Sequence, residues 1–296
     1  MTFGEKIKKL RTDKLMSQSE LAGSEITRNM LSQIENGTAM PSLHTATYLA
    51  TRLNVPLGFL LASEEDEAIY LKHTSIEDIK KAYISRNFEL CYGICKNCNW
   101  RDDELTLILA ESSLRVGAEY FAKGYLHIAA DFFDEAIDCC GNTIYNTDVI
   151  IAEARAYFAY MSLISPTLES TSDDGRELER VFLSNDSFSV YSDIISDAER
   201  VGWDSVPHLA ERTARLPEKS TFALHVNARI MIAEGNYEGA RSLLHKLLYA
   251  DSYGLAEPIL YFVFCDMEIC CKEVGDFKGA YEHSTNKMTL LQKLLA

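Results

Sequence analysis

The chain has 296 residues, of which 47% are hydrophobic, and a formal net charge of −15 at pH 7. This length favours two domains, and the hydrophobic fraction is too high for a disordered protein. The sequence has no run of about 18 apolar residues, and its start leads into an amphipathic segment rather than a signal peptide. We therefore expect a cytoplasmic protein with no membrane partner.

The eight cysteines are typical of a reducing compartment. Cys139-Cys140 and Cys270-Cys271 are adjacent pairs on helical patterns, and the cysteines form no recognisable disulfide framework. Cys91, Cys95 and Cys98 have the spacing of the iron-sulfur motif in radical SAM enzymes. Those enzymes need a β/α barrel, which nothing in this sequence predicts, and cysteine is also a common small packing residue. We therefore expect no cofactor, no metal and no enzymatic activity.

The charge is divided unevenly along the chain. Residues 1–62 contain seven lysines or arginines and five acids, a net charge of +2, so the remainder has a net charge of −17. An acidic protein of this kind can approach nucleic acid only through its basic part, because phosphates repel the rest. The N-terminal region is therefore the part to examine for DNA binding.

The first predicted helix runs from Phe3 to about Lys14. Its apolar face is formed by Phe3, Ile7 and Leu10, and its solvent side by Lys6, Lys8 and Lys9. After Pro41-Ser42, helical spacing resumes from Leu43 to Leu53, and a short helix follows from Leu57 to Leu61.

Two short helices with clear start signals lie between these elements. Ser17 and Glu20 form a capping-box pattern, Thr27 can cap the next helix, and Gly37 supplies the positive-φ residue that ends it. Two short helices joined by a few residues make a helix-turn-helix. The spacing buries one side of the pair, formed by Leu21, Ala22, Ile26, Leu31 and Ile34.

The outward side of this pair carries residue types that recognise base edges. Arginine can bind guanine through two acceptors, and asparagine or glutamine can bridge adenine. These candidate base-reading residues are Gln18, Arg28, Asn29, Ser32 and Gln33.

The first sixty residues resemble the phage-repressor-like (XRE-type) helix-turn-helix family at nearly every landmark. The matching segments are Ile7–Arg11, Ser17–Ala22, Leu31–Gly37, Pro41-Ser42 and Leu53–Pro56. The resemblance implies an internal ion pair between Arg11 and Glu35, which braces the first helix against the third. It also implies that the five outward residues face bases, while phosphates are met by Thr27, Asn36 and Thr38.

We call residues 1–62 the head. One head of this size neutralises few phosphates. Specific binding therefore requires two heads on a pseudo-palindromic operator in double-stranded DNA. We expect a homodimer whose contact comes from the rest of the chain.

After the helix-turn-helix domain at 1–62, we place an acidic junction at 63–74 and a helical repeat domain at 75–296. One turn signature occurs at Gly235-Asn236 and again forty residues later at Gly275-Asp276, and a weaker copy occurs at Arg86-Asn87 after a capping-box pattern at Ser75. A tetratricopeptide-like (TPR-like) helix pair is indicated by Val116, Gly117, Tyr120, Gly124, Ala129, Phe133 and Ala136.

The predicted fold is thus all-α, with a five-helix head and a right-handed TPR-like solenoid of helical hairpins. A helix from Val149 to about Leu163 belongs to this solenoid, and residues 165–175 read as a loop. Residues 176–217 are helical in pattern without a repeat phase that we can assign.

A stack of helical hairpins has a concave inner wall, in which an extended peptide can lie. If Gly117 and Ala228 are the close-packing positions of their helices, groove-facing positions follow at the same spacing. Arginines there would meet peptide carboxylates, and apolar side chains would form pockets. The candidate peptide-binding residues are Phe121, Arg155, Phe158, His225, Arg229 and Ile232.

We call the helical repeat domain the body. A head and a body of these types together resemble the peptide-pheromone-responsive (RRNPP) regulators of Gram-positive bacteria, which include the PlcR, Rgg and PrgX types. The resemblance implies a cytoplasmic homodimer that binds operator DNA through its heads. It also implies that a short imported signalling peptide binds the body and changes the arrangement of the dimer. The alternative is a DNA-binding regulator whose body binds another protein or only dimerises.

Overall fold

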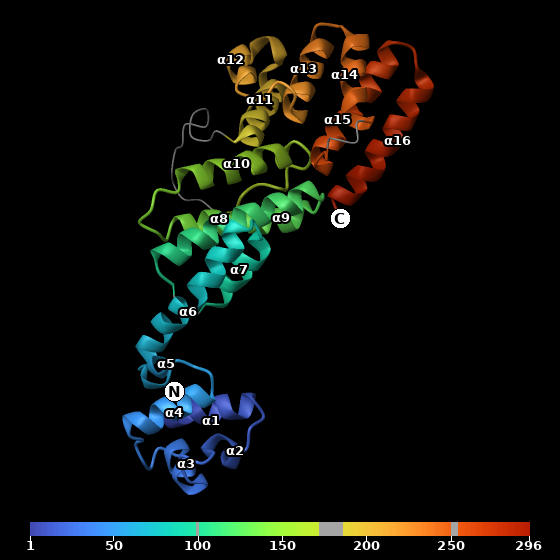
Figure 1. Ribbon diagram of the computed structural model, residues 1–296. Helices are drawn as coiled ribbons and strands as arrows, with labels where there is room; N and C mark the ends of the chain where they lie inside the picture. The colour runs from blue at the N-terminus through green and yellow to red at the C-terminus, as the bar shows by residue number, and fades with distance from the viewer. Residues whose placement is uncertain (99–100, 172–185, 250–253) are drawn as a thin grey trace. The chain divides into compact units, whose positions relative to one another are not determined.

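The computed structural model describes residues 1–98, 101–171, 186–249 and 254–296 (Figure 1). All secondary structure within these ranges is helical, as the sequence predicts. The chain divides into two compact units, Met1–Ser85 with Asn97–Arg101, and Arg86–Lys96 with Asp102–Ala296. Within the described ranges, no helix is both long enough and apolar enough to cross a membrane.

The first unit contains the five predicted helices of the head and one long helix after them. Ser63 begins that sixth helix, because its Oγ accepts a hydrogen bond from the Asp66 amide at 3.1 Å. The helix start that we predicted at Ser75 is absent, since the helix is continuous through it. The elements are α1 (Phe3–Asp13), α2 (Gln18–Ala22), α3 (Arg28–Glu35), α4 (Leu43–Arg52), α5 (Leu57–Leu61) and α6 (Glu64–Ile84).

The apolar faces of α1 to α5 meet in one core, in which Ile7, Leu21 and Leu31 are fully buried. Lys6 does not lie on the solvent side as predicted: it is 1% exposed. Its Nζ donates hydrogen bonds to the carbonyl oxygens of Phe59 and Ala62, at 3.0 and 2.9 Å. These carbonyls belong to the end of α5, where a cation satisfies acceptors that the helix leaves unpaired. Lys6 thus joins α1 to α5.

The second unit is built from helices that pack as successive pairs. The pairs α8 with α9, α13 with α14, and α15 with α16 confirm the predicted helical hairpins. The predicted helix from Val149 corresponds to α10, and the loop and helical pattern predicted at 165–217 fall partly on 172–185, outside the described residues. The elements are α7 (Phe88–Asn97), α8 (Asp103–Ala122), α9 (Leu126–Cys140), α10 (Asp148–Ser162), α11 (Ser187–Val201), the 3₁₀ helix η1 (Trp203–Ser205), α12 (Leu209–Ala214), α13 (Thr221–Ala233), α14 (Tyr237–Tyr249), α15 (Glu257–Glu273) and α16 (Phe277–Leu294).

The predicted turn signature recurs as one backbone conformation. Gly124, Gly235 and Gly275 have φ values of +81°, +77° and +79°, in the left-handed region that ends a helix with little strain in glycine. Arg86 has φ +57° at the weaker copy, so this turn has the same shape without glycine. The sequence signature is weaker there because arginine replaces the glycine that usually occupies a left-handed position.

A polar cap follows each of three of these turns. The side chains of Asn87, Asn236 and Asp276 accept hydrogen bonds from the amides three residues later, at 3.1, 3.0 and 2.9 Å. These caps begin α7, α14 and α16. The turn and the cap together redirect the chain into the second helix of each pair.

Gly117 lies at a close approach of α8 and α9. A Cβ atom at this position would lie 2.7 Å from Cε1 of Phe133, too close for any side chain. The predicted close-packing role of Gly117 is thus confirmed, and the flat aromatic ring of Phe133 occupies the space that glycine leaves.

Candidate functional site

The helix-turn-helix begins and ends at the residues that the sequence predicts. The Ser17 hydroxyl accepts from the Glu20 amide at 3.2 Å, and the Glu20 carboxylate accepts from the Ser17 amide at 2.6 Å. The hydrogen bond from the Ser17 amide to the carboxylate lowers the pKa of Glu20. The Thr27 hydroxyl accepts from the Met30 amide at 3.1 Å and caps α3. Both helices of the motif therefore have their first amides paired locally.

α3 has two chemically different sides. Leu31, Ile34 and Glu35 are buried against the head. The opposite side faces solvent and carries Arg28, Asn29 and Gln33, with Ser32 half-buried beside them. Four of the five predicted base-reading residues thus lie together on one face of one helix, because residues three or four positions apart lie on the same side of an α-helix.

The three predicted phosphate-binding residues lie at the two ends of α3. Thr27, Asn36 and Thr38 are all exposed. The Thr38 hydroxyl donates a hydrogen bond to the carbonyl oxygen of Gln33 at 3.0 Å, which draws the chain after α3 back over the helix end. The exposed face of α3 is therefore bordered at both ends by hydroxyl or amide side chains.

Gln18 differs from the other predicted base-reading residues. Its side chain is half-buried, and its Nε2 donates a hydrogen bond to Oε2 of Glu35 at 2.8 Å. A neighbouring buried carboxylate competes with solvent for this amide, so the side chain turns inward to α3. Gln18 connects α2 to α3 in this structure.

The ion pair between Arg11 and Glu35 is present, as the resemblance implies. The guanidinium Nε and Nη2 donate to the two carboxylate oxygens at 2.6 and 3.1 Å, and Nη1 donates to the carbonyl oxygen of Met16 at 2.8 Å. Burial alone would raise the pKa of Glu35, but hydrogen bonds from Arg11 and Gln18 together with the arginine charge hold it below its usual value. A fork-shaped pair of this kind fixes both distance and orientation. It therefore sets how α3 is held against α1.

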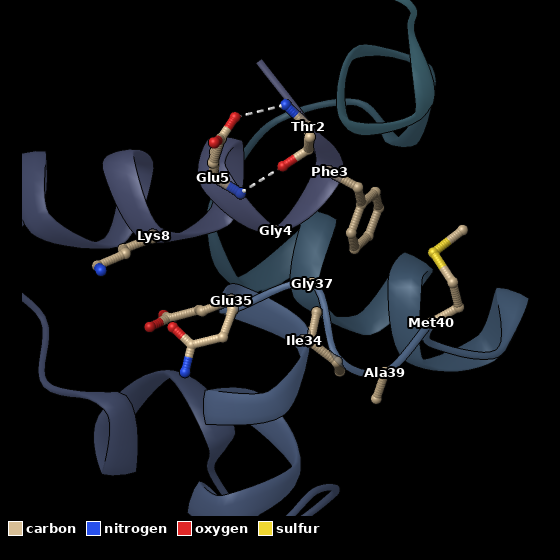
Figure 2. Close-up of a pocket in the computed structure, with 11 residues that line it drawn as sticks. Thr2, Phe3, Gly4, Glu5, Lys8, Ile34, Glu35, Gly37, Ala39 and Met40 are labelled. Carbon is tan, nitrogen blue, oxygen red and sulfur yellow. Dashed lines mark hydrogen bonds between the residues drawn. The ribbon is translucent and has the colours of Figure 1, made fainter.

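A second contact between α1 and α3 was not predicted from the sequence. A Cβ atom on Gly4 would lie 2.2 Å from the carbonyl oxygen of Ile34, so only glycine allows this approach. Beside it opens a pocket of about 510 Å³ between the start of α1 and the turn after α3, with Phe3 and Met40 on its walls (Figure 2). The end of α3 is thus braced against α1 at two points, at Gly4 and at Glu35.

In the body, the predicted peptide-binding residues are buried or half-buried. Phe121, Phe158, His225 and Arg229 are buried, and Arg155 and Ile232 are half-buried. The physical reason is that aromatic rings fill the space between the facing helices. These rings form a continuous set of edge and stacked contacts that includes Phe121, Tyr157, Tyr160, Phe188, Tyr191, Phe222 and Phe262.

A buried chain of hydrogen bonds runs through this aromatic interior. The Tyr160 and Tyr191 hydroxyls lie 3.1 Å apart, and the Tyr191 hydroxyl lies 2.6 Å from Nδ1 of His225. Nε2 of His225 lies 2.8 Å from Oδ2 of Asp266. We call these residues, together with Arg229, the buried polar network. It links α10, α11, α13 and α15.

Arg229 supplies the balancing charge of the network. Its Nε and Nη2 donate to the two oxygens of Asp266 at 2.8 and 3.1 Å, and its Nη1 donates to Oε1 of Glu199 at 2.6 Å. Its guanidinium also lies 5.3 Å from the ring centre of Phe262. We predicted that Arg229 binds a peptide carboxylate. In this structure its guanidinium instead binds two carboxylates of the chain itself.

The protonation states of the network follow from burial and from these partners. Burial lowers the pKa of His225 and outweighs the opposing effect of Asp266. Burial would raise the pKa of Asp266, but Arg229 and His225 hold it below its usual value. We therefore assign a neutral imidazole that donates from Nε2 to an ionised Asp266 and accepts at Nδ1 from Tyr191. Tyr160 then donates to Tyr191, so each side chain in this series of hydrogen bonds has a partner.

We expect the body to lose stability as pH falls below 6.5, the usual pKa of histidine. In that range the unfolded chain takes up a proton at His225 that the folded chain refuses, so the free energy of unfolding falls by up to about 1.4 kcal/mol per pH unit. The check is urea unfolding at pH 7.0 and 5.5 for the wild type and for His225→Gln. The variant should depend less on pH. Burial also lowers the pKa of His283, which stays in both proteins and provides the shared background. An equal pH dependence in the two proteins contradicts the assignment.

The sequence reading missed three members of the network, Tyr160, Tyr191 and Asp266. A signal existed only for Asp266, which is one of two acids in the otherwise apolar segment Phe262–Cys271, the other being Glu268. An acid in such a segment usually has a buried partner. The partner helices, however, could not be placed from their spacing alone.

The cysteines of the iron-sulfur pattern lie on α7 and just after it. Cys91 and Cys95 are buried and Cys98 is half-buried. Cys91 has a pKa of about 6, lowered chiefly by the hydrogen bond to Cys95. In the part of the chain that the structure describes, no three His, Cys, Asp or Glu side chains are grouped to hold a metal ion.

Comparison with known proteins agrees with the geometry of the head. Residues 7–60 match the helix-turn-helix family. No curated protein matches the chain. Among solved structures, the crystal structure of Bacillus thuringiensis PlcR in complex with the peptide PapR7 and DNA aligns with 99% of this chain and 96% of its own, at 10% identity and a TM-score of 0.24. A TM-score this low does not establish a shared fold. The secondary structure of the described residues is therefore all helical, and residues 7–60 form a helix-turn-helix domain of the DNA-binding type.

Proposed function

We propose that this chain is a cytoplasmic transcriptional regulator that binds operator DNA through α3. The observation that supports this best is the exposed face of α3, on which Arg28, Asn29 and Gln33 project together from a helix held by Arg11 and Glu35. Side chains of these types read base edges in the major groove, and a recognition helix must be fixed firmly to place them.

The charge of the chain supports the same assignment. The head has a net charge of +2, whereas the rest of the chain has −17. Phosphates attract the first and repel the second, so only the head can approach the duplex. Two heads on a pseudo-palindromic site would give the affinity that one head lacks, and we therefore propose a homodimer.

We propose further that the body binds a short signalling peptide that alters operator binding. The support is the helical repeat architecture, the resemblance to peptide-responsive regulators, and two half-buried residues, Arg155 and Ile232, of which Ile232 packs against the body core. The buried members of the predicted site, Phe121 and Arg229 among them, become available to a peptide only when the facing helices separate.

The alternative keeps DNA binding and replaces the peptide with a protein partner, or with dimerisation alone. Titration calorimetry of the full chain against a library of short peptides separates the two. Saturable binding to particular peptides supports the signalling reading. If the chain binds none of the peptides, and none of them changes its oligomeric state, the alternative is supported.

We expect Asn29→Ala and Gln33→Ala each to weaken operator binding by about 1–3 kcal/mol, or about 5- to 150-fold, since each removes a two-point contact to a base. The probe is a duplex enriched from a random library by the full-length chain, and binding is measured by fluorescence anisotropy at fixed salt.

Asn227→Ala is the matched control, because Asn227 is an exposed asparagine on α13 in the body. It should bind the duplex as the wild type does. If the wild type enriches no duplex over random competitor at moderate salt, the proposed function is wrong.

A further inference from the structure

The last helix of the chain presents an apolar stripe to solvent. Phe277 and Tyr281 are each 74% exposed, Met288 is 50% exposed, and Leu295, the residue that caps the helix, is 44% exposed. Spacings of four, seven and seven residues place these side chains within an arc of about 40° on an α-helix. The 18 residues of α16 make the stripe about 27 Å long.

The other side of α16 is already occupied by its own unit. α16 packs along α15, Leu294 is buried in the core, and Lys293 lies 5.6 Å from the ring centre of Tyr125. The stripe thus lies on a side of α16 that its own unit leaves largely exposed.

The stripe follows the pattern of a coiled-coil seam. Successive intervals of four, three, four, three and four residues connect its members, which are the d and a positions of a heptad repeat. In order they are Phe277, Tyr281, Ser284, Met288, Leu291 and Leu295. A pattern of this kind is matched by another helix with the same period, and not by a flat surface.

We propose that this stripe pairs with the same stripe of a second copy of the chain, with the two α16 helices antiparallel about a two-fold axis near residue 286. In that register Phe277 meets Leu295 of the second copy, and Tyr281 meets Leu291. Ser284 meets Met288, so the smallest member lies opposite a long, flexible one. Every member of the stripe thus has an apolar or small counterpart, and the contact is closed by its own symmetry.

The charges near the stripe favour a second copy. The chain has a net charge of −15, so most of its surface repels a second copy, but α16 contains three lysines and one glutamate. Lys287 and Lys293 each form an ion pair with a glutamate of α15 in the same chain. Lys278 and Glu282 face each other at 3.9 Å. In the antiparallel register Glu282, the acid of α16, lies opposite Leu290 of the second copy, so the two glutamates do not meet.

This pairing deepens the proposed function by giving the homodimer an interface, and it can be tested separately. The test is sedimentation equilibrium of the full-length chain, in which a dimer has twice the 33.3 kDa mass of one chain. The double variant Tyr281→Glu with Met288→Glu should raise the dimer dissociation constant at least about 100-fold, because it places charges in the centre of the seam. Both residues are at least half exposed, so the variant should keep the helix content of the wild type.

Ile144→Glu is the matched control, since Ile144 is 85% exposed in the turn between α9 and α10. It should sediment as the wild type does. A wild type that is monomeric throughout overturns the proposal, and so does a double variant that remains dimeric.

A cross-linking experiment tests the register. The full-length double variant Phe277→Cys with Leu295→Cys should form a covalent dimer on mild oxidation, because the new thiol at position 277 of one copy lies beside the new thiol at position 295 of the other. The two positions are about 27 Å apart along one helix and cannot join within a chain. Each single variant should give no more covalent dimer than the wild type. A covalent dimer of Phe277→Cys alone indicates parallel helices and overturns the register.

The two proposals fail in different ways. A chain that dimerises through α16 but enriches no duplex keeps this interface and loses the DNA-binding function. A chain that binds DNA with unchanged affinity and stoichiometry in the Tyr281→Glu, Met288→Glu variant keeps the function and loses this interface.

Discussion

Asp266→Ala is expected to destabilise the body by about 3–5 kcal/mol, because it leaves the buried Arg229 with only the partly exposed Glu199 as a carboxylate partner. Arg229 is 8% exposed and His225 is fully buried, and both donate to Asp266. Removing one partner of such a pair costs more than the pair contributes, since the remaining charge stays desolvated. The measurement is urea unfolding followed by tryptophan fluorescence, because Trp203 packs against the body core.

Two further variants make this prediction specific. Asp266→Asn keeps one acceptor oxygen and should lose less stability than Asp266→Ala. Glu282→Ala is the matched surface control, because Glu282 is 62% exposed and pairs only with another exposed side chain at 3.9 Å; it should change the free energy of unfolding by less than about 0.5 kcal/mol. A loss below about 1 kcal/mol for Asp266→Ala would contradict a buried, charge-balanced network.

Glu35→Ala is expected to destabilise the head by a similar amount and to abolish operator binding at concentrations where the wild type is saturated. The carboxylate is 1% exposed and accepts from Arg11 twice and from Gln18 once. Its loss leaves the Arg11 guanidinium, 14% exposed, without a carboxylate and with the Met16 carbonyl oxygen as its remaining partner, at a cost of about 3–5 kcal/mol. It also removes one of the two contacts that brace α3 against α1, and the hydrogen bond from Gln18 that connects α2 to α3. Hydrogen exchange of peptides from residues 1–62, measured in the full-length chain, reports the stability of the head alone.

Glu25→Ala is the matched control for Glu35, because Glu25 is an exposed glutamate in the turn between α2 and α3. It should leave hydrogen exchange and DNA binding unchanged. The double variant Arg11→Ala with Glu35→Ala should be less destabilised than the two single losses added together, since no lone charge stays buried. Additive losses would show that the two side chains do not interact.

The head could be predicted well from the sequence because its signals are local. Ser17, Glu20 and Thr27 act on amides within three residues, so their caps follow from spacing alone. The ion pair of Arg11 and Glu35 followed from the family resemblance. The burial of Lys6 and the close approach at Gly4 did not follow, because both depend on segments about 30 to 55 residues away.

In the body, the repeated turns were predictable and the interior was not. The turns at Gly235 and Gly275 depend on a left-handed residue and on the cap after it, both of which can be read directly from the sequence. Which side chains meet across the array depends on the rotation of every helix about its axis. An error of one residue turns a helix by about 100°, which is enough to move His225 from a predicted groove to the interior.

The filled interior of the body has a thermodynamic consequence for any ligand that uses it. Phe121 and Arg229 already contact groups of their own chain, so a ligand that needs them can bind only to the fraction of molecules in which the helices have parted. The measured affinity is then the intrinsic affinity multiplied by that fraction, and an open population of about 1% weakens binding about 100-fold. Substitutions that loosen the aromatic contacts without touching the ligand would therefore strengthen uptake while they weaken the fold.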